Sequence, residues 1–160
     1  VGWSTRSSLP PRFMSDSYVH GYDSQEALRL KDQADALVDL LHADTTYPDG
    51  STVLEVGCGV GAQTVTLARR SPGARITALD RSPSSLLQAE RRVAEAGLRN
   101  VTFVEADLFA PPFDAASFDH LFVCFVLEHL ADPAAALRTL LRLVRPGGSV
   151  TVIEGDHGSI

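Results

Sequence analysis

The clearest structural signal in this sequence is Val53-Leu-Glu-Val-Gly-Cys-Gly-Val-Gly-Ala62, an apolar run that leads into a loop with glycine at positions 57, 59 and 61. Glycine has no Cβ, so this loop lets the backbone approach a ligand closely, and a helix that begins after it points unpaired N–H groups at that ligand. A strand, a glycine loop and a helix in this order predict a nucleotide-type cofactor site at the first strand-to-helix turn of an α/β sheet.

The chain repeats this alternation of apolar runs and helical segments four more times. Helices are predicted near 61–69, 83–96 and 132–144, with an irregular crossover near 110–116. The runs are short and apolar without alternation, which is typical of parallel strands covered on both faces. The pattern therefore predicts a doubly wound, parallel α/β sheet. Its predicted strands are Thr52–Val56, Arg75–Leu79, Val101–Glu105, His120–Phe125 and Ser149–Glu154.

The region before the sheet is predicted to contain one amphipathic helix, from about Ser24 to His42. Asp23 followed by Glu26 resembles a capping box at its start. The polar stretch before it is broken by two prolines and predicts a flexible leader. We therefore divide the chain into a leader (1–17), a helical segment or lid (18–48) and a cofactor-binding core (49–160).

Composition narrows the class of protein. The chain has 160 residues, 44% of them hydrophobic, and a net charge of −6, which argues against a nucleic-acid or anionic-membrane surface because such surfaces need clustered basic side chains. The only two cysteines, Cys58 and Cys124, suggest neither a disulfide framework nor a metal site. With no membrane-spanning run and no secretory signal in the sequence, we expect a cytoplasmic protein that holds no metal.

The glycine loop by itself leaves two cofactors open. Gly57 to Ala62 also fits the dinucleotide pattern G-x-G-x-x-G/A, and Asp80 follows at about the distance of a ribose-binding acid. A nicotinamide cofactor and S-adenosylmethionine both remain compatible with this pattern.

Three further motifs accompany the loop, in a fixed order along the chain. The loop itself reads E-x-G-x-G-x-G from Glu55 to Gly61. The other motifs are Glu105-Ala-Asp-Leu108 after the third strand, Phe118-Asp119 with Val126-Leu-Glu-His-Leu130 around the fourth, and Arg145-Pro-Gly-Gly148 before the fifth. Together they resemble the class I S-adenosylmethionine-dependent methyltransferases over about 53–154. The resemblance implies a Rossmann-like sheet with strand order 3-2-1-4-5.

Within that class the chain is most similar to a group of bacterial small-molecule methyltransferases. It shares with them Tyr18-Val-His-Gly-Tyr22 and Ile153-Glu-Gly-Asp-His-Gly158. Members of that group continue past this point with a helix and antiparallel strands, so we expect those strands to be missing here and the chain to be truncated. The fifth strand would then be an open sheet edge, which predicts a homodimer through that edge.

The resemblance implies a role for each of a set of cofactor-binding residues. The methionine half would lie against Gly57, Cys58 and Gly59, with Glu55 near its amino group and Gln63 near its carboxylate. Asp80 would accept the ribose hydroxyls, and Arg81 would lie along the adenine. The remaining predicted contacts are Ala106, Asp107 and Leu108 at the adenine, Cys124 and Phe125 beside the crevice, and Tyr18 in a lid.

Two histidines are candidate catalytic bases. His129, next to Glu128, would take a proton from a nucleophile, and His157, next to Asp156, is the competing candidate. The implied reaction moves a methyl group from S-adenosylmethionine to an O, N or C atom of a small-molecule acceptor and leaves S-adenosylhomocysteine.

Two other functions stay open at this point. One is an NAD(P)-dependent oxidoreductase, although the only lysine, Lys31, lies outside any Tyr-x-x-x-Lys pair. The other is a non-catalytic cofactor-binding fragment or assembly module.

Overall fold

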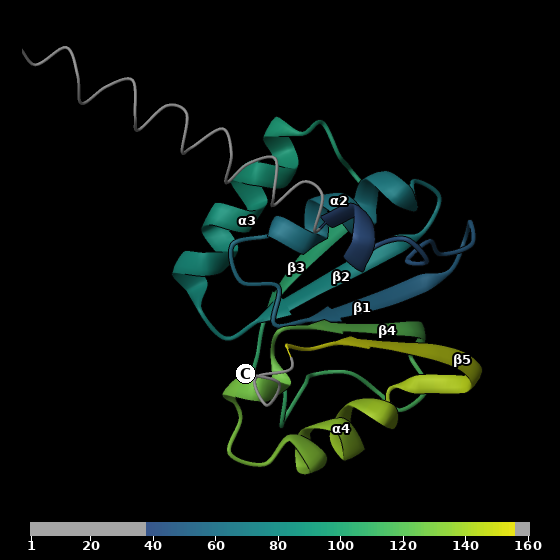
Figure 1. Ribbon diagram of the computed structural model, residues 1–160, viewed down its shortest axis with the longest axis vertical. Coiled ribbons are helices and arrows are strands. Elements are labelled where there is room, and N and C mark those ends of the chain that lie inside the picture. Colours follow the sequence, from purple (N-terminus) through teal and green to yellow (C-terminus); the bar gives the residue numbers. More distant parts are fainter. Residues whose placement is uncertain (1–37, 156–160) are drawn as a thin grey trace, which may run out of the picture. The chain divides into compact units, whose positions relative to one another are not determined.

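A computed structural model describes residues 38–155, which contain one parallel sheet (Figure 1). The strands lie in the order β3-β2-β1-β4-β5, and every neighbouring pair is parallel. This confirms the predicted fold class and strand order. The strands are β1 (Thr52–Val56), β2 (Arg75–Asp80), β3 (Val101–Glu105), β4 (Phe118–Cys124) and β5 (Val144–Ile153).

Helices cover both faces of the sheet. The helices α2 (Ala62–Arg70) and α3 (Pro83–Glu95) lie on one face and α4 (Pro133–Leu141) lies on the other (Figure 1). Successive side chains of β1 lie on opposite faces of the sheet, since Val53 packs with Leu67 of α2 and Leu54 packs with Leu140 of α4. All four side chains are fully buried. This burial on both sides is the physical reason why the strand sequences are apolar without alternation.

The helices α3 and α4 begin where the sequence supplies a cap. The Ser82 hydroxyl accepts a hydrogen bond from the Ser85 N–H, and the Asp132 carboxylate accepts one from the Ala135 N–H. Proline follows each cap, where its missing N–H costs nothing and its fixed φ suits the helix. By contrast, α2 follows Gly61 and has no side-chain cap.

The fourth and fifth strands differ from the prediction. β4 begins at Phe118 and ends at Cys124, because Phe125 has a φ of +54° and leaves the strand. β5 begins at Val144, so the Arg145–Gly148 motif, expected before this strand, lies inside it, and α4 ends at Leu141. A register shift opposite Phe118 to His120 absorbs the extra residues of β5. An edge strand tolerates such a bulge and a proline because one side of it needs no ladder hydrogen bonds.

Two other segments join the sheet to its surroundings. The β3–β4 connection consists of turns, as the predicted irregular crossover implies, and the Phe113 and Phe118 rings pack edge to face at 5.0 Å. A short 3₁₀ helix, η2 (Leu127–His129), which the sequence did not predict, follows β4.

The prediction for the N-terminal region can be compared with the structure only at its end. Residues 38–41 are helical, within the predicted helix that runs to His42. The leader, most of the lid, Tyr18 and His157 lie outside the described residues. Within residues 38–155, no helix is both long and apolar enough to cross a membrane.

Asn100, just before β3, ties the ends of α2 and β2 together. Its Nδ2 lies 3.3, 3.0 and 3.2 Å from the carbonyl oxygens of Ala68, Ser71 and Ala74.

We expect Asn100→Ala to lower the free energy of unfolding by about 1–3 kcal/mol, because part-buried carbonyls lose their donor. Urea denaturation measures the change, and Arg99→Ala, at an exposed neighbouring position, should change it by less than about 0.5 kcal/mol. Equal effects of the two substitutions would contradict this role.

Candidate functional site

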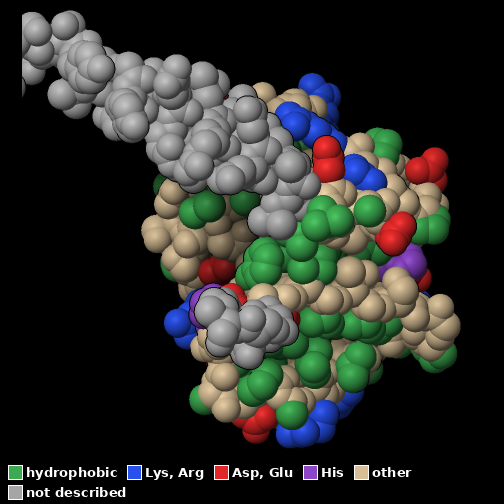
Figure 2. Space-filling view, in the orientation of Figure 1, with side chains coloured by type: hydrophobic (Ala, Val, Ile, Leu, Met, Phe, Trp, Pro, Cys, Tyr) green, Lys and Arg blue, Asp and Glu red, His purple; other side chains and the backbone are tan. Residues whose placement is uncertain are grey.

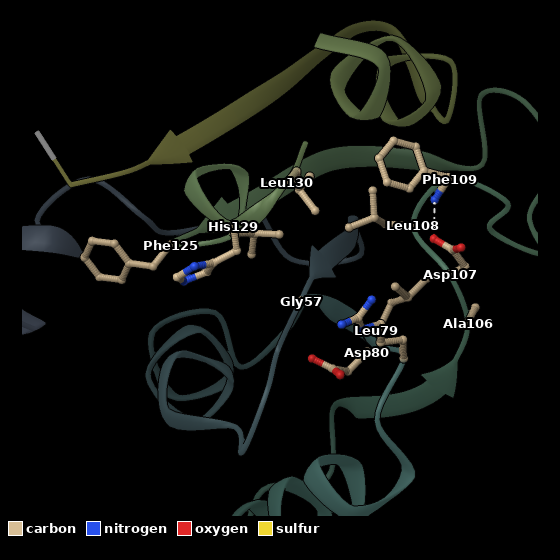
Figure 3. A pocket seen from close by; sticks show the side chains of 12 residues that line it. Gly57, Leu79, Asp80, Ala106, Asp107, Leu108, Phe109, Phe125, His129 and Leu130 are labelled. Carbon is tan, nitrogen blue, oxygen red and sulfur yellow. Dashed lines mark hydrogen bonds between the residues drawn. The ribbon is translucent and has the colours of Figure 1, made fainter. Parts of the chain in front are cut away.

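A cavity of about 500 Å³ lies at the carboxyl ends of the central strands (Figure 3). In a doubly wound sheet the strand order reverses between β1 and β4, since β1 is followed by β2 on one side and β4 is followed by β5 on the other, and ligands bind at such a switch point. The cavity is lined by Gly57, Leu79, Asp80, Arg81, Ala106, Asp107, Leu108, Phe109, Phe125, Val126, His129 and Leu130.

The glycine loop is fixed to the end of β2. The N–H groups of Gly57 and Cys58 donate to the Leu79 carbonyl oxygen at 2.7 and 3.1 Å. Gly57 has a φ of +69°, and a Cβ on it would lie 2.6 Å from Cγ2 of Val126. Only glycine fits here, because the backbone conformation and the close approach of Val126 both exclude a side chain.

Asp80 joins the loop to the start of α3. Its Oδ2 accepts a hydrogen bond from the Gly59 N–H at 2.8 Å, and its Oδ1 accepts one from the Ser82 N–H at 2.9 Å. These two amides fix the plane of the carboxylate, and each oxygen keeps a lone pair for a further donor. A Cβ built on Gly59 would meet nothing within 4 Å, so the loop is open above this position. A ligand with two adjacent hydroxyl groups fits such a carboxylate.

The residues after β3 form the next part of the cavity wall. The Ala106 N–H donates to the Asp80 carbonyl oxygen at 3.1 Å, which places this segment beside β2. Oδ1 of Asp107 accepts a hydrogen bond from the Phe109 N–H at 2.9 Å and so closes a tight turn. The ring of Phe109 is 43% exposed. An aromatic face beside a carboxylate suits a flat, polar heterocycle.

The opposite wall comes from the segment after β4. Phe125, His129 and Leu130 extend from it, across the cavity from Asp80 and Asp107 (Figure 3). The His129 side chain is 73% exposed, and its Nε2 lies 3.4 Å from the Glu128 carboxylate. The imidazole is therefore accessible from the cavity, as the predicted base must be.

Glu55 lies beneath the loop and not in the cavity lining. It is 2% exposed, and Oε2 has no hydrogen-bond partner among the described residues. Burial, and to a smaller extent the negative charge of Asp80, raise the pKa of Glu55 to about 7. A buried carboxylate with an unpaired oxygen favours a cationic ligand group nearby.

The other predicted residues lie around the cavity without lining it. The thiols of Cys58 and Cys124 are buried, and burial raises their pKa values to about 12 and about 11, so both are neutral. Gln63 has its Oε1 2.5 Å from Nε2 of the buried His42, which leaves its amide nitrogen for other contacts.

The structure thus brings eight predicted residues to one cavity. They are Gly57, Asp80, Arg81, Ala106, Asp107, Leu108, Phe125 and His129. Sequence reasoning assigned no site role to Leu79, Phe109, Val126 and Leu130. Leu79 and Phe109 lie next to the predicted Asp80 and Leu108, and Val126 and Leu130 are the ends of a motif that the sequence did identify. Among residues 38–155, no three His, Cys, Asp or Glu side chains lie where they could hold a metal ion.

With this geometry established, comparison with known proteins identifies the class. Residues 53–148 match the family described as "Methyltransferase domain". The chain therefore belongs to this family. The motifs predicted the same class, the S-adenosylmethionine-dependent methyltransferases. The crystal structure of a coclaurine N-methyltransferase bound to N-methylheliamine and S-adenosylhomocysteine is similar at a TM-score of 0.65 and 28% identity, over 73% of this chain and 34% of that one.

Curated relatives support the same family. A demethylmenaquinone methyltransferase of Thermus thermophilus is 36% identical over 102 residues, which are 64% of this chain and 46% of the relative. A trans-aconitate 2-methyltransferase of Azoarcus sp. is 35% identical over 133 residues, which are 82% of this chain and 49% of the relative. The chain spans about half the length of these relatives.

One similar solved structure carries a different kind of name. The [4+2]-cyclase SpnF has a TM-score of 0.68 and 32% identity to this chain, over 76% of this chain and 44% of that one. The core fold is therefore shared by proteins named for methyl transfer and by one named for cyclisation.

The raised pKa of Glu55 makes stability depend on pH. A carboxyl group with a pKa near 4.5 when unfolded and about 7 when folded binds more protons in the folded state between these values. The contribution of Glu55 to the free energy of unfolding should therefore be fully present below pH 4.5 and be lost, by about 3 kcal/mol, as the pH rises through 7.

Urea denaturation across pH 4.5–8 measures this dependence. Glu55→Gln should flatten it, whereas Glu105→Gln, at an exposed position that ends β3, should leave it unchanged. A wild-type profile that rises with pH over this range would contradict the assignment.

Proposed function

We propose that this chain binds S-adenosylmethionine and transfers its methyl group to an O, N or C nucleophile of a small molecule. The observation that carries the proposal is the Asp80 carboxylate, which the Gly59 and Ser82 amides orient at the edge of the cavity. When bound, the cofactor supplies an electrophilic methyl group on a sulfonium centre.

The residues present suit this cofactor from end to end. Asp80 would accept the ribose hydroxyls, and the turn at Asp107 and Leu108 would hold the adenine. The open loop at Gly59 leaves room for the methionine half. The buried carboxylate of Glu55, beneath the loop, would complement positive charge on that half.

Catalysis by this chain would consist mainly of positioning. Holding an acceptor in line with the methyl group supplies roughly 7–11 kcal/mol of the barrier. His129 would accept the proton that the nucleophile loses, since its imidazole lies in the cavity wall and is exposed. His157, outside the described residues, stays the second candidate base, and Tyr18 the candidate lid.

The acceptor is proposed to be a small molecule in the cytoplasm. The named relatives act, by their names, on demethylmenaquinone and trans-aconitate, and a net charge of −6 disfavours a nucleic acid. The rivals that the test must separate from this proposal are an NAD(P)-dependent oxidoreductase and a non-catalytic binding module.

Calorimetric titration with S-adenosylhomocysteine, and with NADH in parallel, tests the proposal. We expect micromolar binding of S-adenosylhomocysteine and no heat from NADH. Asp80→Ala should weaken binding at least about tenfold because it removes a charged hydrogen-bond acceptor. Asp114→Ala, at an exposed position in the β3–β4 connection, is the matched control and should bind as the wild type does.

Three results would contradict the proposal. Binding of NADH without S-adenosylhomocysteine would favour the oxidoreductase, and silence from both ligands would exclude a competent cofactor site in this chain. Tight binding with no methyl transfer to any acceptor would favour the non-catalytic module.

We also propose that the chain pairs with a second copy through β5. The outer edge of β5 has no strand beside it within residues 38–155, and Val150 and Val152 are 39% and 41% exposed. Figure 2 shows hydrophobic side chains gathered over this part of the sheet and α4. Unpaired backbone groups beside exposed apolar side chains favour edge-to-edge association.

Sedimentation velocity tests this pairing. The wild type should sediment as a dimer, and Val152→Lys should be monomeric because a charged side chain blocks edge pairing. Leu87→Lys replaces an equally exposed residue of α3 and should leave the dimer intact. A monomeric wild type would show that the edge does not pair.

A further inference from the structure

The end of β5 carries a carboxylate that the proposed chemistry does not use. Glu154 follows the last residue of this strand, and its side chain meets the start of η2. Its Oε1 accepts hydrogen bonds from the N–H groups of Val126 at 3.0 Å and Leu127 at 2.9 Å, and its Oε2 accepts one from the Glu128 N–H at 3.3 Å. One carboxylate therefore satisfies three successive amides.

These amides have no cap within their own segment. The residue before η2 is Val126, which has no side-chain oxygen, and η2 has no side-chain cap of its own. Glu154 supplies the missing acceptor from a different strand. Hydrogen bonds from backbone N–H groups to a carboxylate are charge-assisted, and a negative charge at a helix start is favourable.

The same end of β5 also holds a strained residue. Phe125 has a φ of +54°, a left-handed conformation that is unfavourable for a residue other than glycine. Its N–H donates to the Ile153 carbonyl oxygen at 2.8 Å. Ile153 and Glu154 together therefore hold a turn that the local sequence does not favour.

The segment held in this way is one wall of the cavity. Phe125, Val126, His129 and Leu130 all line it, and Val126 also packs against the backbone of Gly57. Glu154 itself is not part of the lining. A shift of η2 would move the candidate base and release the contact that confines the glycine loop.

We propose that Glu154 is a positioning residue for the cofactor cleft. It acts through the amides of residues 126–128, which fix the wall that faces Asp80 and the loop at Gly57. The ligand named in the test rests on the proposed function, whereas the positioning role can also be measured without any ligand.

The binding experiment compares three proteins by calorimetry with S-adenosylhomocysteine. Glu154→Ala should raise the dissociation constant about tenfold, because three amides lose a charged acceptor. Glu154→Gln keeps one oxygen for the Val126 and Leu127 amides, so it should stay within about threefold of the wild type. If Glu154 only stabilised the fold, Glu154→Ala and Glu154→Gln would bind equally well when compared at the same fraction of folded protein.

Asp119→Ala is the matched control. Asp119 lies at the opposite end of the same sheet, where its Oδ2 accepts hydrogen bonds from the Thr52 N–H at 2.8 Å and hydroxyl at 2.9 Å, and its Oδ1 accepts one from Arg145 at 2.6 Å. Its loss should lower the urea midpoint and leave the dissociation constant unchanged. Equal weakening of binding by Asp119→Ala and Glu154→Ala would overturn the proposal, since general destabilisation would then account for both.

A ligand-free measurement separates this proposal from the proposed function. In amide NMR spectra, Glu154→Ala should shift the signals of residues 126–128 and of Gly57, and Asp119→Ala should leave them in place. An unchanged Gly57 signal in Glu154→Ala would overturn the positioning role. So would a wild type that binds S-adenosylhomocysteine and a Glu154→Ala variant that binds it equally well. If the wild type does not bind, the proposed function fails, and the Gly57 signal still decides the role of Glu154.

Discussion

The carbonyl oxygen of Leu79 is the point on which the site is built. It accepts hydrogen bonds from the N–H groups of Gly57 and Cys58, so the loop after β1 is fixed to the end of β2. The next residue, Asp80, continues this chain of contacts, since its carboxylate accepts the Gly59 N–H and its carbonyl oxygen accepts the Ala106 N–H. Three successive strand ends are thus joined by backbone groups that parallel pairing brings together.

The other half of the cavity is held differently. β1 and β2 are buried on both faces, whereas the wall after β4 depends on contacts from β5, an edge strand that is exposed along most of its length. The half formed by β1 and β2 would keep the cofactor-binding loop in place. The half held by β5 has fewer buried contacts and would open more easily. This division suits a cleft that must keep one ligand in place while a second ligand enters and leaves.

Family membership describes the core and leaves the acceptor open. The similar proteins include methyltransferases named for a menaquinone precursor, for trans-aconitate and for coclaurine, together with a cyclase. One core therefore serves different reactions, and the chemistry of each depends on the residues around the core. In this chain, burial of the charged form of Glu55 costs free energy of folding. Ionisable groups with strongly shifted pKa values are characteristic of functional sites.

The sequence by itself determined the parallel sheet and the motifs of the family, and the resemblance that these motifs carry implied the strand order and eight residues of the cavity. It could do so because strand runs, glycine loops and caps are local patterns, which need no knowledge of distant contacts. It misplaced the ends of β4 and β5 and gave no sign of η2. Those features depend on the φ of Phe125, on a bulge at a sheet edge and on hydrogen bonds from Glu154. Only the tertiary structure decided them, because each joins segments more than twenty residues apart whose pairing no local pattern records.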